Sequence, residues 1–279
     1  MGLVINTNVS AINTAAALNK SGDSLKMSME RLSTGKEINS AADNAAGKAI
    51  ATNMTKQLNE LEQGINNAKD GENLLSTMDG AASAIEDMTQ RMRTLTVQAL
   101  NGTYQDSDRA LLDVEFAALS DEITRVADST SFNGINLIGD DAAAVPAANI
   151  NIQVGSDTIA LTATDLAADA LGINSTGAGA IDIQDSTNAA AALIKIDLAL
   201  TSIIDARTNF GAESNRLSYT TTALESTATN TAAARSQIED ADFAKETTNL
   251  ARAKVLQNAG IAMLQQANAQ TANVEQLLR

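Results

Sequence analysis

The feature that most constrains this chain is a helical pattern that runs without a break from about residue 45 to residue 99. Apolar residues recur there at alternating steps of four and three, which places them on one face of an α-helix. The clearest part of this face is Leu74, Met78, Ala81, Ile85, Met88, Met92, Leu95 and Ala99. Such a helix would extend roughly 80 Å, far beyond an ordinary globular helix. The chain contains a single proline, Pro146, so almost nothing interrupts long helices.

Further helices are predicted on both sides of the middle of the chain. Asn101-Gly102 ends the first helix, and Asp106 or Ser107 is expected to cap the next one. That second helix carries Leu112, Phe116, Leu119, Ile123 and Val126. Helical spacing resumes at Ala189 and continues with Leu193, Ile196, Leu200, Ile203 and Phe210. A seven-residue repeat then follows through Leu217, Leu224, Thr231 and Ile238.

Residues 132–183 differ in character from the helical segments. Phe132-Asn133-Gly134 is a turn signal. Apolar and polar residues alternate over residues 150–154 and again over 159–161, with Gly155-Ser156-Asp157 as the turn between them. This pattern predicts a β-hairpin. The Gly- and Ser-containing segment at residues 174–180 predicts an exposed, flexible loop.

Both ends of the chain carry a seven-residue apolar repeat. Near the N-terminus the repeat is Leu18, Leu25 and Leu32, with Gly22 and Met29 at the alternate positions. Thr34-Gly35 marks a break before a turn at residues 40–43. The last segment keeps an unbroken heptad register through Leu250, Ala253, Gln257, Gly260, Leu264, Ala267, Thr271, Val274 and Leu278.

These terminal helices are short of large apolar residues, so neither is expected to be stable alone. We predict that the two ends pair with each other and with neighbouring copies of the chain. An ordinary intramolecular bundle is the alternative, because periodicity does not distinguish the two. The expected core of the assembly is Ile5, Val9, Ile12, Leu18, Leu25, Leu32, Leu250, Gly260, Leu264, Ala267, Val274 and Leu278.

Charge is distributed unevenly along the chain. The net charge is −15, yet residues 1–43 sum to zero and residues 236–279 to −1. No basic residue lies between Arg125 and Lys195, against eight acidic ones. Near-neutral ends can pack together, whereas an acidic middle favours water and repels nucleic acid and anionic lipid. No stretch approaches 18 apolar residues, and the N-terminus lacks the pattern of a cleavable signal peptide.

Composition disfavours most enzyme chemistry. The chain has no His and no Cys, which removes the usual general base, the thiolate nucleophile and the common metal ligands. Neither Gly35-Lys36 nor Gly47-Lys48 completes a phosphate-binding loop. Asp106-Ser107-Asp108 lacks the later ligands of a calcium loop. We therefore expect no catalytic site, no metal and no cofactor.

Short motifs at both ends point to a known family. At the N-terminal end they are Val4-Ile5-Asn6-Thr7-Asn8, Glu30-Arg31-Leu32-Ser33-Thr34-Gly35 and the run from Ile38 to Gly47. At the C-terminal end they are the run from Ala234 to Phe243, Gln265-Gln266-Ala267-Asn268 and Leu277-Leu278-Arg279. Together they closely resemble bacterial flagellin, in the same order and over essentially the whole chain.

The resemblance implies a mainly α fold, a long antiparallel helical and coiled-coil bundle with a small β-hairpin region in the middle. It implies terminal helices at residues 1–43 and 236–279 that form the inner filament core, and a helical bundle domain at residues 44–235. Large outer domains look absent, since a short loop occupies residues 170–190. The implied function is the structural subunit of the flagellar filament; a hook–filament junction protein of the same architecture is the alternative.

The resemblance also implies partners and a location. Members of the family are exported unfolded through the hollow flagellum and work outside the cell. Implied partners are further copies of the chain, a cytosolic export chaperone, and the cap and junction proteins of the flagellum.

Two further properties of the family suggest surface sites. An animal Toll-like receptor recognises some flagellins, and the matching residues here are Gln90, Arg91, Leu95 and Glu115. Thr94 departs from the family pattern, in which receptor-activating members usually carry Glu. O-linked glycans are the second property, and the candidate acceptors are Ser156, Ser175, Thr176, Ser186 and Thr187.

Overall fold

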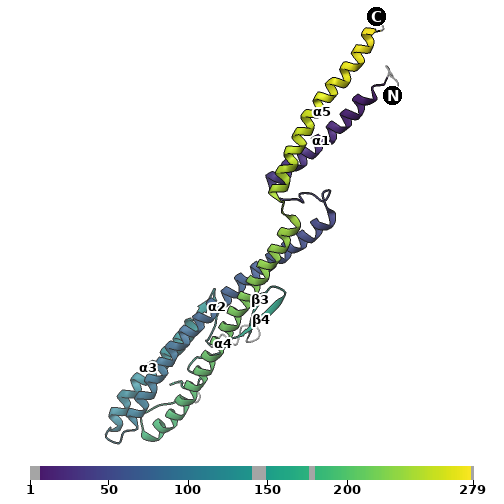
Figure 1. The fold of residues 1–279 in the computed structure, drawn as a ribbon. Coiled ribbons are helices and arrows are strands. Elements are labelled where there is room, and N and C mark those ends of the chain that lie inside the picture. The colour runs from purple at the N-terminus through teal and green to yellow at the C-terminus, as the bar shows by residue number, and fades with distance from the viewer. Residues whose placement is uncertain (1–6, 140–148, 176–179, 278–279) are drawn as a thin grey trace. The chain divides into compact units, whose positions relative to one another are not determined.

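The computed structural model describes residues 7–139, 149–175 and 180–277, with side chains up to residue 269 apart from Asn149 (Figure 1). The helices are α1 (Val9–Thr34), α2 (Ala45–Ala99), α3 (Asp106–Ser129), α4 (Ser186–Glu239) and α5 (Phe243–Leu277). The strands are β1 (Ser131–Phe132), β2 (Ile135–Asn136), β3 (Asn149–Val154) and β4 (Asp157–Thr162). The predicted mainly α fold with a small hairpin region is confirmed.

The chain forms two compact units. The terminal unit comprises Met1–Leu58 and Thr229–Arg279, and the central unit comprises Asn59–Ala228. The terminal unit thus extends beyond the terminal segments expected at residues 1–43 and 236–279. The beginning of α2 belongs to it because Ala51 and Leu58 are buried there.

The longest predicted helix is α2, and its bounds agree with the sequence pattern. Asn44 begins it, since its Oδ1 accepts a hydrogen bond from the Gly47 N–H at 2.9 Å. At its other end the buried Arg109 of α3 donates through Nε to the Ala99 carbonyl at 2.8 Å. Arg109 therefore satisfies a carbonyl that the end of α2 would otherwise leave without a partner.

The predicted cap of α3 is wrong. The N-cap is Gln105, and Asp106 is already the first helical residue. The Asp108 carboxylate accepts the Gln105 backbone N–H at 3.1 Å, so the acid three residues after the cap closes the turn.

The central unit packs α2, α3 and α4 around one apolar core. The predicted apolar faces of all three helices are buried or half-buried, which confirms the four-three spacing. Arg207 of α4 reinforces the pairing with α2, because its guanidinium forms ion pairs with Asp79 and Glu86. The largest fully buried side chains include Leu75, Met78, Ile85, Met92, Leu95, Phe116, Ile123, Leu137, Ile138, Leu161, Leu166 and Ile173.

The predicted hairpin is β3 and β4, which pair antiparallel from Asn149↔Thr162 to Val154↔Asp157. The turn contains only Gly155 and Ser156, so Asp157 belongs to β4 and not to the turn. Gly155 has a φ of 66°, a left-handed conformation that favours glycine.

A second, smaller hairpin joins β1 and β2. The sequence predicted a turn there, and Asn133 and Gly134 form it with φ values of 51° and 80°. Two left-handed residues in succession are the geometry of a two-residue β-hairpin.

The expectation of an exposed loop at residues 174–180 is only partly met. Residues 176–179 lie outside the described part of the chain, but Asn174 and Ser175 are half-buried. The Ser175 N–H donates to the Ser120 Oγ of α3 at 3.1 Å. The neighbouring Ile173 and Ile181 are buried in the core, so they pull the start of the loop onto the bundle.

The β3–β4 hairpin lies against α2 at two glycines. A Cβ added at Gly64 would lie 2.5 Å from the Gly155 backbone nitrogen. One added at Gly71 would lie 3.2 Å from Ile152 Cγ1. Asn67, between them, donates through Nδ2 to the Gln153 carbonyl at 2.8 Å. The two glycines of α2 thus let the backbone of the β3–β4 hairpin approach the helix backbone closely.

We expect Gly64→Ala to destabilise the chain by about 1–3 kcal/mol, because the methyl group must displace the turn of the hairpin. Gly80→Ala is the matched control, because a Cβ there meets nothing within 4 Å. We expect that variant to be more stable than wild type by about 0.5–1 kcal/mol. Urea unfolding followed by circular dichroism measures both; equal effects at the two positions would contradict the close approach.

Candidate functional site

The site of interest is the pair of terminal helices, α1 and α5, which lie side by side in the terminal unit (Figure 1). Asn8 caps α1, since its Oδ1 accepts the Ala11 N–H at 3.0 Å. The helix ends at Gly35, whose left-handed φ of 71° confirms the predicted break. The pair is antiparallel, because Asn8 bonds to the Ala267 carbonyl and Ser28 bonds to Glu246.

The contact between α1 and α5 is made by small residues and hydroxyl groups. Ser21 Oγ donates to the Ala253 carbonyl at 2.9 Å, and Ser28 Oγ donates to Glu246 Oε2 at 3.0 Å. A Cβ added at Gly260 would lie 3.3 Å from Leu18 Cδ1, so Leu18 fits against that glycine. The contact therefore combines polar hydrogen bonds with the packing of Leu18 against a glycine.

The predicted heptad positions are only partly the buried ones. Leu18, Leu25, Leu32, Leu250, Gly260 and Leu264 are half-buried, while Ala253 and Ala267 are buried. Of the alternate positions predicted in α1, Gly22 is half-buried and Met29 is exposed, whereas Ser21 and Ser28, one residue earlier, are buried. The buried alternate positions thus lie one residue earlier than predicted. Ser21 and Ser28 are spaced seven residues apart, just as Gly22 and Met29 are, so the seven-residue repeat alone does not distinguish the two pairs.

The remaining predicted core residues are exposed in a single copy or lie outside the described part of the chain. Val9 and Ile12 are exposed. Ile5 and Leu278 lie outside the described residues, as does the side chain of Val274.

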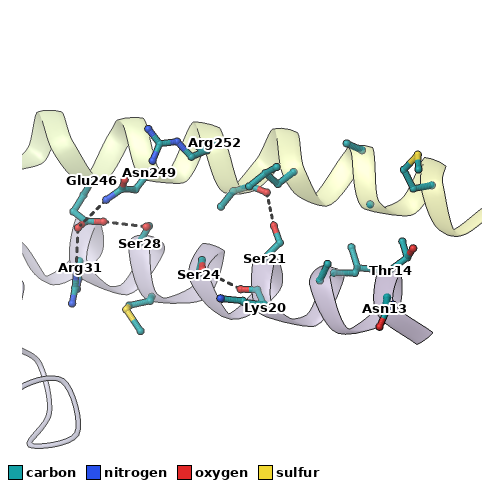
Figure 2. Close-up of a pocket in the computed structure, with 18 residues that line it drawn as sticks. Asn13, Thr14, Lys20, Ser21, Ser24, Ser28, Arg31, Glu246, Asn249 and Arg252 are labelled. Carbon is teal, nitrogen blue, oxygen red and sulfur yellow. Dashed lines mark hydrogen bonds and ion pairs between the residues drawn. The ribbon is translucent and has the colours of Figure 1, made fainter. Parts of the chain in front are cut away.

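Glu246 is a buried carboxylate in this contact, with only 3% of its surface exposed. It accepts hydrogen bonds from Ser28 Oγ and from Arg31 Nη1 at 3.2 Å, and also from Asn249 (Figure 2). Burial works to raise the pKa of Glu246, but the bonds from Ser28, Arg31 and Asn249 outweigh it, so the pKa lies below its ordinary value. The site therefore favours the charged form.

A second buried carboxylate, Glu239, lies where the chain breaks before α5. Lys36 Nζ approaches its Oε1 at 2.8 Å and Lys48 Nζ approaches the same oxygen at 3.4 Å. The Lys36 hydrogen bond lowers the pKa of Glu239, burial opposes it, and Lys48 lowers it further. Two backbone hydrogen bonds join the same two segments. The Glu37 N–H donates to the Glu239 carbonyl, and the Ala241 N–H donates to the Gly35 carbonyl. The segment that follows α1 is thus bonded to the segment that joins α4 to α5.

Sequence reasoning missed these polar residues, although a signal for them exists. Thr14, Ser21 and Ser28 are spaced seven residues apart, on the helix face next to the predicted leucine repeat. Glu246 stands seven residues before Ala253, in the column that continues to Gly260 and Ala267. A column of hydroxyls opposite a column of small residues is typical of a close helix contact.

A groove of about 750 Å³ runs along one face of the α1/α5 pair (Figure 2). Its apolar lining includes Leu18, Met27, Leu256 and Met263. Its cationic lining is Lys20, Arg31 and Arg252, with Glu246 as the acid. The Arg31 Nε is buried and has no hydrogen-bond partner among the described residues.

Several apolar side chains of the α1/α5 pair, inside and outside the groove, are exposed in a single copy. On α1 they are Val9, Ile12, Met27 and Met29, and on α5 they are Phe243, Val255, Leu256, Ile261 and Met263. Apolar groups gathered on the outside of a two-helix pair mark an interaction surface.

The receptor candidates lie in the central unit. Arg91 of α2 pairs with Glu115 of α3, with Nη2 and Oε1 2.7 Å apart, and both side chains are exposed. Gln90 is exposed as well. Leu95 is only 1% exposed, because its side chain fills the core of the folded chain.

The candidate glycan acceptors separate into three groups. Ser156, Ser186 and Thr187 are exposed. Thr176 lies outside the described residues. The Ser175 hydroxyl is buried in the folded chain.

Within the described residues, no helix is both long and apolar enough to cross a membrane. The same part of the chain holds no group of three or more acidic side chains placed to bind a metal ion.

Family models match both ends of the chain. Residues 5–143 match the bacterial flagellin N-terminal helical region, and residues 193–278 match the bacterial flagellin C-terminal helical region. Together these models cover both terminal helices and most of the central bundle.

Individual relatives match over nearly the full length. A flagellin of Halalkalibacterium halodurans is 39% identical over 99% of this chain and 100% of its own length. A flagellin of Bacillus subtilis is 36% identical over 99% of both chains. The crystal structure of Bacillus cereus flagellin is 36% identical, with a TM-score of 0.50, and covers 61% of this chain and 94% of its own. The chain belongs to the bacterial flagellin family.

Proposed function

We propose that this chain is the structural subunit of a bacterial flagellar filament and that it polymerises through the α1/α5 pair. The observation that carries the proposal is the incomplete packing of that pair. Its inner contact is made of serines, alanines and a glycine, while larger apolar residues such as Ile12, Val255 and Ile261 face outward. Neighbouring copies would cover these residues and fill the groove.

The energetics favour a shared core. Burial of apolar surface contributes about 25 cal/mol per Å², and each copy adds many exposed apolar side chains to the joint contact. That gain offsets the entropy lost when the terminal helices are ordered.

Seeded growth tests the proposal. Purified monomer incubated with short filament fragments is expected to extend them into long filaments, because each seed end presents a preformed partner surface. Electron microscopy and light scattering measure the growth. Monomer that binds seeds but never lengthens them would contradict the function.

The hook–filament junction alternative shares the terminal patterns. The full-length relatives named above are flagellins, which favours the filament subunit. Long filaments made by this chain alone in the same assay would distinguish the two, since a junction protein ends growth after few copies.

Other partners follow from family membership. An export chaperone would hold the C-terminal segment before assembly, and cap and junction proteins would contact the two ends of the filament. The site of action is outside the cell, reached through the export channel of the flagellum. The role is structural and not catalytic, which agrees with a chain that has no His and no Cys.

Two surface roles are part of the proposal. Gln90, Arg91 and Glu115 are exposed and are candidate contacts for an animal Toll-like receptor. Ser156, Ser186 and Thr187 are exposed candidate acceptors for O-linked glycans. Receptor binding by wild type but not by Arg91→Ala, with both chains equally folded, would support the first role.

A further inference from the structure

We propose that Met27 and Met263 form an oxidation-sensitive site in the groove of the α1/α5 pair. A peroxide would convert their thioethers to sulfoxides in the free subunit, and the modified subunit would join a filament much more slowly. This inference rests on the proposed function, in which a neighbouring copy fills the groove.

The two methionines are placed for such a role. Both line the groove, and they come from different helices. Met27 adjoins Ser28, which bonds to Glu246, and Met263 lies one turn beyond Gly260, which packs against Leu18. They therefore lie toward opposite ends of the groove. In a single copy Met27 is 46% exposed and Met263 is 61% exposed, so an oxidant in solution reaches both.

All sulfur atoms of this chain are in methionine side chains. It contains eight Met and no Cys, so no thiol competes for oxidant. Met78 and Met92 are buried in the central core and are protected. Met29 is 56% exposed but does not line the groove, although it lies only two residues from Met27. The chain thus carries its own control for position.

The chemical step is balanced by the peroxide alone. The methionine sulfur donates an electron pair to one peroxide oxygen, the O–O bond breaks, and a sulfur–oxygen bond forms. Sulfur is oxidised by two electrons, and the second peroxide oxygen leaves as water with the two protons of hydrogen peroxide.

The effect would fall on assembly and not on folding. In the free subunit both side chains are exposed, so the sulfoxide oxygen can keep its hydration there. When a neighbour covers the groove, a flexible apolar side chain has become polar and must lose its hydration. Two such groups lie in each groove, so the penalty is met twice for each subunit that is added.

The test compares oxidised and untreated full-length monomer in seeded growth. After treatment with dilute hydrogen peroxide, mass spectrometry is expected to find oxygen added at Met27, Met263 and Met29, but not at Met78 or Met92. We expect growth to slow at least tenfold while circular dichroism and the melting temperature stay unchanged. A methionine sulfoxide reductase should restore growth. In assembled filaments Met27 and Met263 should resist the same treatment.

Variants assign the effect to the groove. The pair Met27→Leu and Met263→Leu should keep growth under peroxide, and Met29→Leu should not. The pair Met27→Gln and Met263→Gln should grow slowly without peroxide. Peroxide that slows the double Leu variant as much as wild type would overturn the inference while leaving the filament function intact. Untreated wild-type monomer that fails to extend seeds would overturn both.

Discussion

Removal of residues 1–40 or of residues 240–279 is expected to abolish filament growth and to leave the central unit folded. The core of the central unit is drawn from α2, α3, α4 and the hairpins, all within residues 59–228. The α1/α5 pair contributes nothing to that core, yet it carries the exposed apolar surface through which copies are proposed to join. Each deletion also removes the only described partner helix of the remaining terminal helix.

Circular dichroism and urea unfolding measure the folded state, and electron microscopy after seeding measures assembly. We expect the loss of helical signal to be confined to the residues removed and to the terminal helix left without its partner, the central unit to keep its unfolding transition, and no filaments to form. Filaments made by either truncated chain would show that assembly does not need both terminal helices.

A point substitution separates the surface from the helix that carries it. Leu256 is exposed and lines the groove, so Leu256→Asp adds a charge that a neighbouring copy would have to bury. Asn258→Asp adds the same charge at an exposed position of α5 that does not line the groove. We expect the first variant to fold as wild type and fail to extend seeds, and the second to extend them.

Substitution of Glu246 by Gln is expected to raise the critical concentration for assembly about 5- to 100-fold at pH 7. The carboxylate accepts hydrogen bonds from Ser28, Arg31 and Asn249. Hydrogen bonds to a charged group contribute about 1–3 kcal/mol of stability, and this free energy sets the size of the expected change in critical concentration. Gln keeps the shape but removes the charge that faces Arg31. The α1/α5 pair of the variant is therefore weaker, and so is any assembly built on it.

The pH dependence of this difference has a definite sign. The pKa of Glu246 in the folded chain lies below its ordinary value of 4.5, so its stabilising contribution is fully present above that pH. The contribution is lost as the pH falls through the lowered pKa, when the carboxylate takes up a proton. Wild type and Glu246→Gln should thus differ most at neutral pH and converge in acid.

Critical concentrations measured by sedimentation between pH 7 and pH 3 test this expectation. Glu30→Gln is the control, since Glu30 is exposed on α1. It should resemble wild type throughout the range. A difference that persists once the wild-type carboxylate is protonated would show that the carboxylate charge is not the cause.

Local patterns predicted most of the fold. The apolar spacing fixed α2 to the residue, and the alternation at residues 150–161 fixed the β3–β4 hairpin. Helix and strand periodicities are properties of neighbouring residues, so a sequence records them directly. The cap of α3 and the inner column of α1 were mistaken because two adjacent residues fit each pattern equally well.

Contacts between distant residues were beyond such patterns. Glu246 meets Ser28 and Arg31, and Glu239 meets Lys36 and Lys48, across about 200 residues of chain. The register of an antiparallel pair decides which of these groups meet, and register follows from the whole contact. The burial of Leu95 and of the Ser175 hydroxyl likewise depends on elements that pack from elsewhere.

The sequence by itself determined that this chain is built from very long helices, that its ends are near-neutral heptads and that it resembles flagellin. The tertiary structure decided which face of each end is inward, because that choice depends on the fit of Ser21, Ser28 and Leu18 against α5. It also decided that the inward contact is thin and polar while larger apolar residues remain outside. A helix records its own period in its sequence, but the surface that it leaves uncovered exists only once its partner is in place.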